Sequence, residues 1–567
     1  MPVTPKSPEP SPEQQAVIEG VVTFVKRYGR LGALHGAAGT GKTFTCGYIA
    51  RRLLELFLEK SVFFISPTHA ALRILRSKIP SGTKAATVAR FLKTEPYRVF
   101  DEVEFEIPDE SKYVKIAEEH RKNLFRDKGG NAEYNDNLRI VICDESSMIS
   151  QPQADALRGI CKELGVTFLM VGDPYQLPPV LPDKERRRLM SLLPTEELHD
   201  DIVYSKDMCR EVRLPKIGFQ LTEVHRNAGA ILRAAVAIRN DFNSKHHSLP
   251  DRPDLDVAGE DANRTGIYVT NDYWDWVRNL AEAVRESENG LDVAAICHHN
   301  RTVLSLTNDL RSLMYPASYK TNWNAGEYVL LPKQTEQAPS FNLENGVNAV
   351  DVKGWDYSDA FYSTTYCKVL KVETQEKNFY FGKWPLGDGT DYEFRLKGCF
   401  QRIVLKACHF YGPPRSIFRP VFTDGQPLAD LKEAEKMVRL MQKNKTVPEK
   451  GDKGYADHPV GKILLCMQSF FRDINCANTM TVHKSQGCTL RVAFIHEDVA
   501  DCKRHYRNSL LYTALTRASH QEVVFNSACL ETALPRWEIG KHQLSLPPSE
   551  RKPPKLSEQE IDDLLEF

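Results

Sequence analysis

The sequence predicts an α/β protein built on two parallel β-sheets. Short apolar runs of the strand type recur along the chain with helical stretches between them, and they form an early and a late group. These runs are 61–65, 138–143, 166–171, 293–297, 492–495 and 522–525. Strands that alternate with helices over such distances are typical of parallel sheets. Because one hydrophobic core rarely grows past about 250–300 residues, a chain of 567 residues is expected to fold as several domains.

A glycine-rich loop between an apolar run and a helical stretch is the strongest local feature. Residues 31–35 are mostly apolar, and residues 43–57 carry apolar side chains at helical spacing. The loop reads G-A-A-G-T-G-K-T, a pattern whose backbone N–H groups cradle a polyphosphate. Lys42 is expected to reach the β- and γ-phosphates, and Thr43 to ligate Mg²⁺. The predicted ligands of a Mg²⁺-nucleotide such as ATP are therefore Gly36, Gly39, Thr40, Gly41, Lys42 and Thr43.

Two further apolar runs end in residues suited to nucleotide hydrolysis. Asp144 and Glu145 follow the run at 138–143. Asp144 is expected to hold the metal ion, and Glu145 to polarise the attacking water as a general base. The run at 166–171 leads into G-D-P-Y-Q, and strand ends in a parallel sheet line the ligand crevice. Gln176 is therefore expected to contact the γ-phosphate.

Two arginines are candidates for stabilising charge on the phosphates. Arg226 ends the segment L-T-E-V-H-R, and Arg517 ends Y-T-A-L-T-R. Arginine suits a transition state whose negative charge is spread over several phosphate oxygens. Taken singly, an arginine of this kind more often forms a surface ion pair.

Composition limits the class of protein and its partners. The chain has 75 basic and 75 acidic residues, so any polyanion must be held by a local groove rather than by net charge. It contains no long apolar run and no signal-peptide pattern, so neither membrane insertion nor secretion is expected. Thirteen cysteines without a C-x-x-C pair favour a reducing cytosol. A metal site at His298 and His299 is not expected, because adjacent strand residues point to opposite faces.

Two segments depart from the α/β pattern. From about 325 to 475 the chain is rich in aromatic and β-branched runs broken by turn residues, which predicts a small antiparallel β module. Residues 95–137 separate two strands of the first core. Their alternating apolar and acidic residues at 100–107 predict a half-exposed strand or hairpin, followed by a charged helix near 114–125.

The ordered motifs resemble those of superfamily 1B helicases, the group that contains RecD and the phage helicase Dda. Seven segments carry the resemblance between positions 36 and 518: G-A-A-G-T-G-K-T, S-P-T-H-A-A, C-D-E-S-S-M, G-D-P-Y-Q-L-P-P-V, L-T-E-V-H-R, T-V-H-K-S-Q-G-C-T and Y-T-A-L-T-R-A. The second and sixth are most similar to the Dda subgroup. The segment 296–301 departs from the threonine- or asparagine-containing segment usual in the family.

The resemblance implies two RecA-like P-loop motor domains with ATP bound between them and two inserted subdomains. The implied domains are a first motor domain (1–94 and 138–225), a pin that splits the duplex (95–137), a second motor domain (226–325 and 476–530), an SH3-like β insertion (326–475) and a C-terminal tail (531–567). It gives the nucleotide roles to the residues already named and adds Gln14 as an adenine contact, although Gln15 is a neighbouring alternative. The implied contacts to the DNA strand, mostly at phosphates, are Pro67, Thr68, His69, Thr87, Thr481 and His483.

The activity implied is an ATP-dependent helicase that moves 5′ to 3′ on single-stranded DNA and opens forks in replication, recombination or repair. The implied location is the cytoplasm of a bacterium or of a phage-infected host. Two alternatives stay open. One is a translocase that strips proteins from DNA or drives branch migration with little unwinding, and the other is a nucleotide-switched loading or scaffold protein.

The C-terminal tail holds two segments that resemble docking peptides. The first resembles the peptide by which bacterial replication factors bind the sliding clamp, and it consists of Gln543, Leu544, Ser545, Leu546 and Pro547. The second starts at Ser557 with a capping-box pattern and ends in an acidic, amphipathic stretch at Phe567. It predicts contact with a replisome or single-strand-binding partner. Packing of either segment on the motor itself is the alternative.

Overall fold

The computed structural model describes most of the chain between residues 9 and 537. The residues outside the description are 1–8, 28, 58–60, 94–95, 100–101, 106, 125–137, 178–217, 226–228, 243–246, 257–264, 288–289, 319–322, 332–338, 345, 353–364, 387–388, 409–412, 422–423, 449–457, 502–505, 536 and 538–567. Arg226 and both docking segments of the tail therefore lie outside the described residues. None of the described helices combines the length and apolar character needed to span a membrane.

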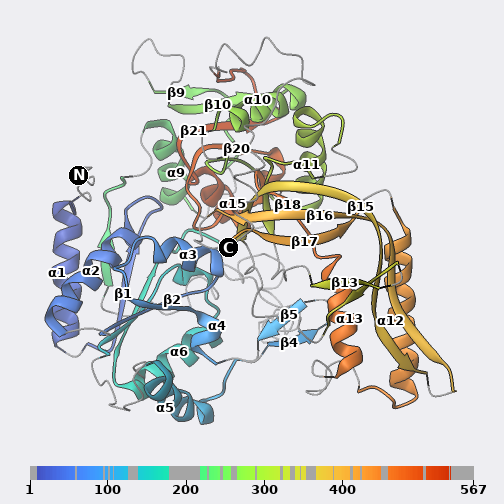
Figure 1. Cartoon of the computed structure of the whole chain (residues 1–567). Helices are drawn as coiled ribbons and strands as arrows, with labels where there is room; N and C mark the ends of the chain where they lie inside the picture. Colours follow the sequence, from blue (N-terminus) through green and yellow to red (C-terminus); the bar gives the residue numbers. More distant parts are fainter. Residues whose placement is uncertain are drawn as a thin grey trace, which may run out of the picture. The chain divides into compact units, whose positions relative to one another are not determined.

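The first sheet is parallel and six-stranded, with the order β3-β2-β6-β7-β1-β8 (Figure 1). Its strands are β1 (Leu31–Gly36), β2 (Val62–Ser66), β3 (Lys84–Thr87), β6 (Ile140–Cys143), β7 (Thr167–Gly172) and β8 (Gly218–Leu221). The helices of this region are α1 (Pro12–Lys26), α2 (Lys42–Phe57), α3 (His69–Arg76), α4 (Val88–Phe91), α5 (Tyr113–Leu124) and α6 (Gln151–Leu164), with 3₁₀ turns η1 (Glu110–Lys112) and η2 (Ser146–Met148).

Alternate residues of these strands fill two separate cores. Phe64 and Ile142 join a cluster with residues of α1 and α2, whereas Phe63 and Val141 join a cluster with residues of α6. A parallel sheet covered on both faces needs apolar residues at consecutive positions. This need explains the continuous apolar runs in the sequence.

The second sheet is also six-stranded, with the order β19-β11-β20-β21-β10-β9. Its strands are β9 (Asp254–Leu255), β10 (Gly266–Thr270), β11 (Val293–Cys297), β19 (Thr479–Thr481), β20 (Leu490–Ile495) and β21 (Ala518–Phe525). Strand β21 pairs in parallel with β10 and β20, and β9 is antiparallel. Its helices are α9 (Gly229–Asn240), α10 (Tyr273–Glu286), α11 (Asn300–Met314), α14 (Val482–Ser485) and α15 (Tyr506–Leu515), with η4 (Glu497–Ala500). The predicted fold class, two RecA-like P-loop domains with parallel sheets, is confirmed.

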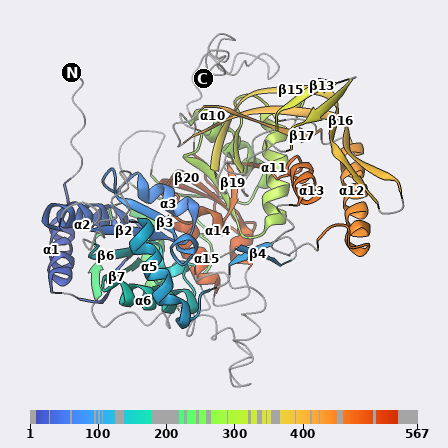
Figure 2. The same cartoon turned by 60° about the horizontal axis from the view of Figure 1, so that its bottom comes forward.

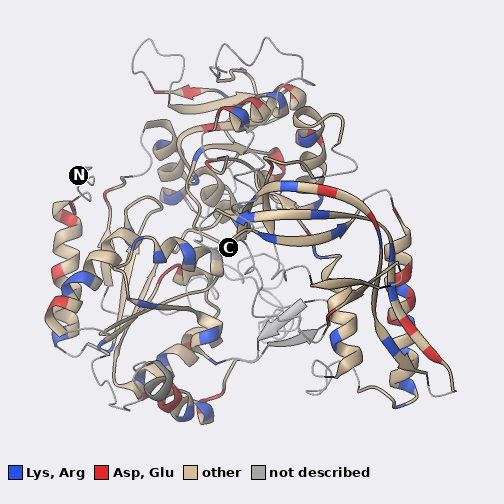
Figure 3. Ribbon diagram, in the orientation of Figure 1, with Lys and Arg blue, Asp and Glu red and all other residues tan. Residues whose placement is uncertain are grey.

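A third, seven-stranded sheet occupies the region expected to be a β module. Its strands are β12 (Tyr328–Leu331), β13 (Phe341–Glu344), β14 (Val347–Val350), β15 (Thr365–Pro385), β16 (Asp391–Ala407), β17 (Arg415–Pro420) and β18 (Asn475–Cys476). Strands β15 and β16 form a long antiparallel ribbon. Basic and acidic residues both occur along β15 and on α12 (Figure 3).

Two helices in this region were not expected from the sequence. They are α12 (Gln426–Lys443) and α13 (Pro459–Ser469), and their apolar residues share one core with the ribbon, including Phe379, Phe394, Leu431 and Leu464. Helix α12 lies along β16 in both views (Figures 1 and 2). Between residues 95 and 137, β4 (Pro96–Val99) and β5 (Glu102–Phe105) form an antiparallel hairpin. The pin and SH3-like identities of these insertions stay predictions, as do the domain boundaries.

Backbone contacts divide the chain into two compact units. The first comprises Met1–Trp276, Ala295–Thr302 and Thr481–Arg536, and the second comprises Val277–Ala294, Val303–Met480 and Trp537–Phe567. Every contact of the candidate sites described below lies within the first unit.

Candidate functional site

The phosphate loop joins β1 to α2. Gly39 and Gly41 have φ angles of 85° and 78°, a region that favours glycine because a Cβ atom is disfavoured there. The Lys42 ammonium donates hydrogen bonds to the carbonyl oxygens of Gly36 at 3.0 Å and Ala37 at 2.9 Å. The Thr43 hydroxyl donates to Asp144 Oδ2 at 2.9 Å. Both side chains that were predicted to hold a Mg²⁺-nucleotide are thus directed at the loop and the carboxylate beside it.

The sheet order brings the predicted hydrolytic residues together. Strands β6, β7 and β1 are adjacent in the first sheet, and all of their pairings are parallel. Asp144 and Glu145 follow β6, Gln176 lies beyond β7, and the phosphate loop follows β1. The carboxyl ends of parallel strands meet at one edge, so these groups lie at the same edge of the first sheet.

Glu145 and Gln176 both carry buried polar atoms without a protein partner. Glu145 has φ 54° and ψ 41°, a left-handed conformation that costs a residue with a side chain about 1–3 kcal/mol and is found at functional sites. Its Oε2 and the Oε1 of Gln176 form no hydrogen bond, and Gln176 is only 3% exposed. Since buried polar atoms are normally hydrogen-bonded, both atoms indicate a site built for a polar ligand.

The surroundings of Asp144 suit a bound cation. Burial and the neighbouring charge of Glu145 raise the pKa of Asp144 to about 7, against the lowering effect of the Thr43 hydrogen bond. A divalent cation would favour the charged carboxylate, and the hydroxyl and carboxylate oxygens are ligands that Mg²⁺ accepts. Among the described residues no group of three or more His, Cys, Asp or Glu could hold a metal ion. A magnesium ion at Thr43 and Asp144 would therefore depend on phosphate oxygens and water for its other ligands.

Helix α1 supports the loop from the other side. Gln14 is buried, and its Nε2 donates to the carbonyl oxygen of Thr40 at 3.2 Å. Gln15 is exposed and bonds to Glu19. Glu13 accepts hydrogen bonds from the backbone N–H groups of Thr222 and Glu223, both at 2.9 Å. Of the two glutamines that the sequence left as alternatives, Gln14 is the one against the phosphate loop, and its contact with adenine stays a prediction.

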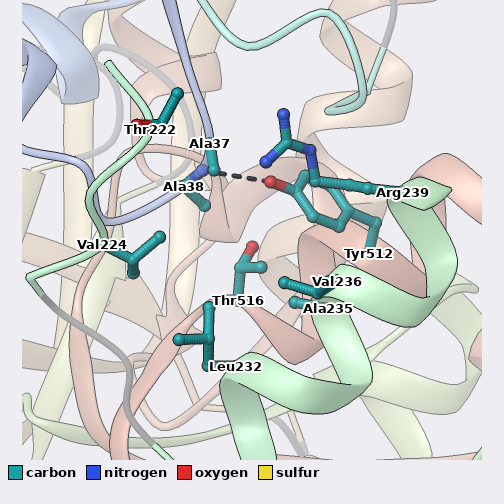
Figure 4. A pocket seen from close by; sticks show the side chains of 10 residues that line it. All are labelled: Ala37, Ala38, Thr222, Val224, Leu232, Ala235, Val236, Arg239, Tyr512 and Thr516. Carbon is teal, nitrogen blue, oxygen red and sulfur yellow. Dashed lines mark hydrogen bonds between the residues drawn. The ribbon is translucent and has the colours of Figure 1, made fainter.

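A pocket of about 170 Å³ opens beside the phosphate loop (Figure 4). Tyr512 of α15 is 1% exposed, accepts a hydrogen bond from the Ala38 N–H at 3.0 Å and donates one to Asp173 Oδ2 at 2.7 Å. Tyr512 and Arg239 of α9 both point toward the loop in Figure 4. The pocket is lined by Ala37, Ala38, Thr222, Val224, Leu232, Ala235, Val236, Arg239, Tyr512 and Thr516.

Arg239 and Tyr512 are the candidate residues that sequence reasoning missed. The Arg239 guanidinium carbon lies 4.9 Å from the ring centroid of Tyr175, and its Nε is buried without a partner. Tyr175 is also edge-to-face with Phe242 at 5.1 Å. Tyr512 begins the Y-T-A-L-T-R segment, so the motif itself was a signal that could have marked it as a candidate site residue. Arg239 ends an ordinary helical pattern, and nothing local in the sequence distinguishes it.

Arg517 is held inside its own part of the fold. It is 1% exposed, and its guanidinium donates to the carbonyl oxygens of Thr513 at 2.9 Å and of Ser485 and Cys488 at 3.4 Å. Its fourth hydrogen bond goes to the Thr516 hydroxyl. In this conformation Arg517 ties the end of α15 to the end of α14 and to the residues just after it. Its predicted role toward the nucleotide stays a prediction.

The predicted nucleic-acid residues of the first sheet lie at the carboxyl ends of strands near the β3 end of the strand order. Pro67, Thr68 and His69 follow β2, and Thr87 ends β3, the two strands at the far edge from β1. Burial and the charges of Arg76 and Arg90 lower the pKa of His69. The cations close to this edge suit a phosphate backbone.

Three of the predicted nucleic-acid residues are helix N-caps. The hydroxyl oxygens of Thr68, Thr87 and Thr481 accept hydrogen bonds from the backbone N–H groups of Ala71, Arg90 and Lys484 at 3.2, 3.3 and 3.4 Å. A capping hydroxyl acts as acceptor and keeps its own hydrogen. Thr87 and Thr481 are buried, and contact of the three hydroxyls with DNA phosphates stays a prediction.

Two family models match parts of the chain. The AAA domain family matches residues 9–207, and the UvrD-like helicase C-terminal domain family matches residues 477–525. An uncharacterised protein of Acanthamoeba polyphaga mimivirus is 22% identical over 86% of this chain and 94% of its own length. An uncharacterised protein of Methanocaldococcus jannaschii is 26% identical over 64% of this chain, but the match spans 28% of that protein.

Solved structures of Pif1 helicases are also similar to the chain. The Bacteroides Pif1 helicase in complex with ADP-AlF3 and ssDNA is 15% identical with a TM-score of 0.43, covering 93% of this chain and 95% of that one. Pif1 helicase from Candida albicans is 16% identical with a TM-score of 0.43, and the match covers 93% of this chain and 97% of that one.

The two family matches fall on the two parts of the chain that hold the motifs. The AAA domain match covers the phosphate loop, Asp144, Glu145 and Gln176, and the helicase C-terminal match covers His483 and Arg517. The likeness to the Dda subgroup is not confirmed by these matches. The positions of the two matches agree with the resemblance of the ordered motifs to superfamily 1 helicases.

Proposed function

We propose that this helicase is driven by ATP and moves 5′ to 3′ on single-stranded DNA, unwinding duplex at forks in replication, recombination or repair. The observation that supports this most is the phosphate loop, where Lys42 and Thr43 lie beside Asp144 while Tyr512 and Arg239 point to the same loop from the second group of elements. A nucleotide held between two domains can couple its hydrolysis to opening and closing of the site. The direction of movement is supported only by the resemblance to RecD and Dda.

The residues of the first sheet would hold and activate the nucleotide. Thr43 and Asp144 would bind Mg²⁺, which would supply positive charge against the phosphate oxygens. Lys42 would bind the β- and γ-phosphates. Glu145, whose Oε2 has no protein partner, would accept a proton from the attacking water. Gln176 would donate a hydrogen bond from its side-chain Nε2 to the γ-phosphate and respond to its loss.

Arginines would stabilise the charge that develops during hydrolysis. Arg239 is added to this role because its guanidinium lies in the pocket beside Ala37 and Ala38 (Figure 4). Arg226 and Arg517 keep the role proposed from their motifs. For Arg517 the role requires that nucleotide or DNA binding break its hydrogen bonds to Ser485 and Cys488.

Nucleic acid would be gripped through its phosphates by two groups of residues. One follows β2 and β3 of the first sheet, and the other is Thr481 and His483 at α14. Hydroxyl and imidazole groups there would hold the strand without base readout. The sliding clamp and a single-strand-binding protein are proposed partners of the tail segments that begin at Gln543 and Ser557.

Unwinding of duplexes that carry a single-stranded overhang tests the proposed function. With ATP, a DNA duplex with a 5′ overhang should be separated, and one with a 3′ overhang should not. The same pair made in RNA tests the choice of nucleic acid. Unwinding from the 3′ overhang only would overturn the direction, and ATP hydrolysis that single-stranded DNA leaves unchanged would favour a loading or scaffold protein.

The β4–β5 hairpin separates a helicase from a translocase that does little unwinding. Replacing residues 96–105 with a short glycine-serine linker should abolish strand separation and keep DNA-stimulated ATP hydrolysis. Unchanged unwinding by this variant would contradict the proposed pin. A strand-displacement assay and a phosphate-release assay on the same preparation provide the two measurements.

A further inference from the structure

Two segments contact the phosphate loop from outside it. One is the first turn of α1, and the other is residues 222–225, which follow β8. Strand β8 pairs in parallel with β1, so residues 222–225 leave the sheet beside the loop. A Cβ atom at Gly41 would lie 2.6 Å from Nε2 of Gln14 and 3.9 Å from Cδ2 of His225. Both segments therefore lie close to the same glycine of the loop.

Hydrogen bonds from these segments orient two peptide groups of the loop. The carbonyl oxygen of Gly39 accepts a hydrogen bond from the His225 N–H at 2.9 Å. The carbonyl oxygen of Thr40 accepts one from Gln14 Nε2 at 3.2 Å. In a planar trans peptide the carbonyl and the N–H that follows it point in opposite directions. The bond from Gln14 thus directs the Gly41 N–H away from α1, and the direction of this loop N–H depends on where Gln14 lies.

Glu13 joins the two segments that supply these donors. Its Oε1 accepts hydrogen bonds from the Thr222 N–H at 2.9 Å and the Thr222 hydroxyl at 2.5 Å, and its Oε2 accepts one from the Glu223 N–H at 2.9 Å. Burial works to raise the pKa of Glu13, but these hydrogen bonds and the charge of His225 lower it below its usual value. The carboxylate is therefore charged at neutral pH, and hydrogen bonds to a charged acceptor are stronger than neutral ones.

The turn of α1 that carries Glu13 is itself fixed. The Ser11 N–H donates to Oε1 of Gln14 at 3.0 Å, and the Gln14 N–H donates to the Ser11 hydroxyl oxygen at 3.4 Å, which together form a capping box. Pro12 begins the helix, where its fixed φ angle suits the helical backbone. Neighbouring residues of one rigid turn thus make the two contacts. Gln14 bonds the phosphate loop, and Glu13 bonds residues 222–225.

We infer that Glu13 is a positioning residue for ATP hydrolysis, which holds residues 222–225 to the first turn of α1 so that His225 and Gln14 orient the phosphate loop together. This inference rests on the proposed function. Glu13 acts through the two segments rather than on the nucleotide. Donors in a phosphate loop matter most where charge develops in the transition state, so their misplacement should lower kcat more than it raises the KM for ATP.

Glu13→Gln tests the inference. The side chain keeps its size, but an amide has one acceptor oxygen, and its NH₂ group would face a backbone N–H donor. With saturating single-stranded DNA, the kcat of ATP hydrolysis should fall about tenfold, whereas the KM for ATP should change by less than about threefold. Glu19→Gln on the same helix is the matched control. Glu19 contacts Gln15 and Arg52 at the surface, so this variant should keep the normal kcat.

A double-variant cycle with Thr222→Val tests whether Glu13 acts through residues 222–225. Valine keeps the shape of threonine and removes the hydroxyl that donates to Glu13. Alone it should lower kcat about threefold. The double variant should be no slower than Glu13→Gln, because the effects of residues that act as a unit are not additive.

The outcomes separate the inference from the proposed function. A normal kcat in Glu13→Gln, or effects that multiply in the double variant, would overturn the inference and leave the proposed function intact. If Glu13→Gln melts at a lower temperature than the unaltered protein, the kcat of Thr222→Val decides, and a normal value there would overturn the inference. Failure of the unaltered protein to hydrolyse ATP would overturn both.

Discussion

The two sheets contribute to the nucleotide site in different ways. At the first sheet, Glu145 and Gln176 carry buried polar atoms without partners, and Thr43 already bonds Asp144. At the second, Arg517 is fully engaged with its own neighbours, and Tyr512 bonds both Ala38 and Asp173. The polar groups at the first sheet include atoms left open for a ligand, whereas those at the second sheet are held by contacts within the protein.

This difference distinguishes residues that would carry out ATP hydrolysis from residues that would link the bound nucleotide to a change of conformation. Groups of the first sheet lie together at its carboxyl edge, and Lys42 has only to exchange its hydrogen bonds to Gly36 and Ala37 for phosphate oxygens. Their loss should therefore remove hydrolysis directly. The hydrogen bonds of the Tyr512 hydroxyl and the Arg517 guanidinium must change if these groups respond to nucleotide. A bound ligand shifts a conformational equilibrium through such changes of contact. Variants of Tyr512 and Arg517, called the second group below together with Arg239, should therefore change the melting temperature and its response to nucleotide.

Lys42→Ala gives the largest expected effect. The ammonium is the cation proposed to bind the β- and γ-phosphates, so ATP hydrolysis should fall by at least about a hundredfold. Binding to single-stranded DNA, which uses other strand ends, should stay measurable. Lys26→Ala, at an exposed position of α1, is the matched control. Phosphate release and oligonucleotide binding are measured, and near-normal turnover in Lys42→Ala would refute the nucleotide site.

Arg239→Ala tests whether the second group supplies a cation to the nucleotide. Its guanidinium lies in the pocket beside the phosphate loop, so turnover should fall by about tenfold or more. The melting temperature should change little, because the side chain loses mainly its contact with Tyr175. Arg233→Ala on the same helix removes ion pairs with Asp254 and Asp256 and should keep normal turnover. Equal turnover in both variants would exclude Arg239 from the reaction.

The sequence predicted the first group better than the second for a physical reason. Lys42, Thr43, Asp144 and Glu145 lie in short motifs at strand ends, where local pattern and chemistry coincide. The Tyr512–Asp173 hydrogen bond joins residues 339 positions apart. Such a pairing depends on how distant elements pack, which no local pattern contains.

The third sheet shows a second limit of the sequence. Residues 367–372 predicted a short strand, but β15 runs to Pro385 through exposed polar positions at 374–376. That part of the ribbon faces solvent, so its apolar pattern is interrupted although its pairing with β16 continues. Helices α12 and α13 cover the other face there. The two helices were missed because the whole of residues 325–475 was predicted to be a β module.

Arg517→Ala tests whether this arginine is structural or responds to nucleotide. Loss of its bonds to buried carbonyl oxygens should cost about 1–3 kcal/mol and lower the melting temperature. If the guanidinium stays where it is, the rise in melting temperature on adding a non-hydrolysable ATP analogue should be unchanged. Arg252→Ala, at an exposed position, is the control. A smaller nucleotide-induced rise in Arg517→Ala would instead support its proposed role at the phosphates.

Tyr512→Phe gives the smallest expected effect and the finest test of the contrast. The change removes one hydroxyl, leaving the Ala38 N–H and Asp173 without their hydrogen bonds to it. The melting temperature should fall by about 2–4 °C for each kcal/mol lost. If bound nucleotide takes the place of the Tyr512 hydroxyl, that hydroxyl no longer stabilises the protein when the ATP analogue is bound. The difference in melting temperature between Tyr512→Phe and the unaltered protein should then be smaller with the analogue than without it. Tyr175→Phe, which keeps its ring beneath Arg239, is the matched control. A difference that persists with the analogue bound would show that Tyr512 is a fixed part of the site, and the second group would then be as prearranged as the first.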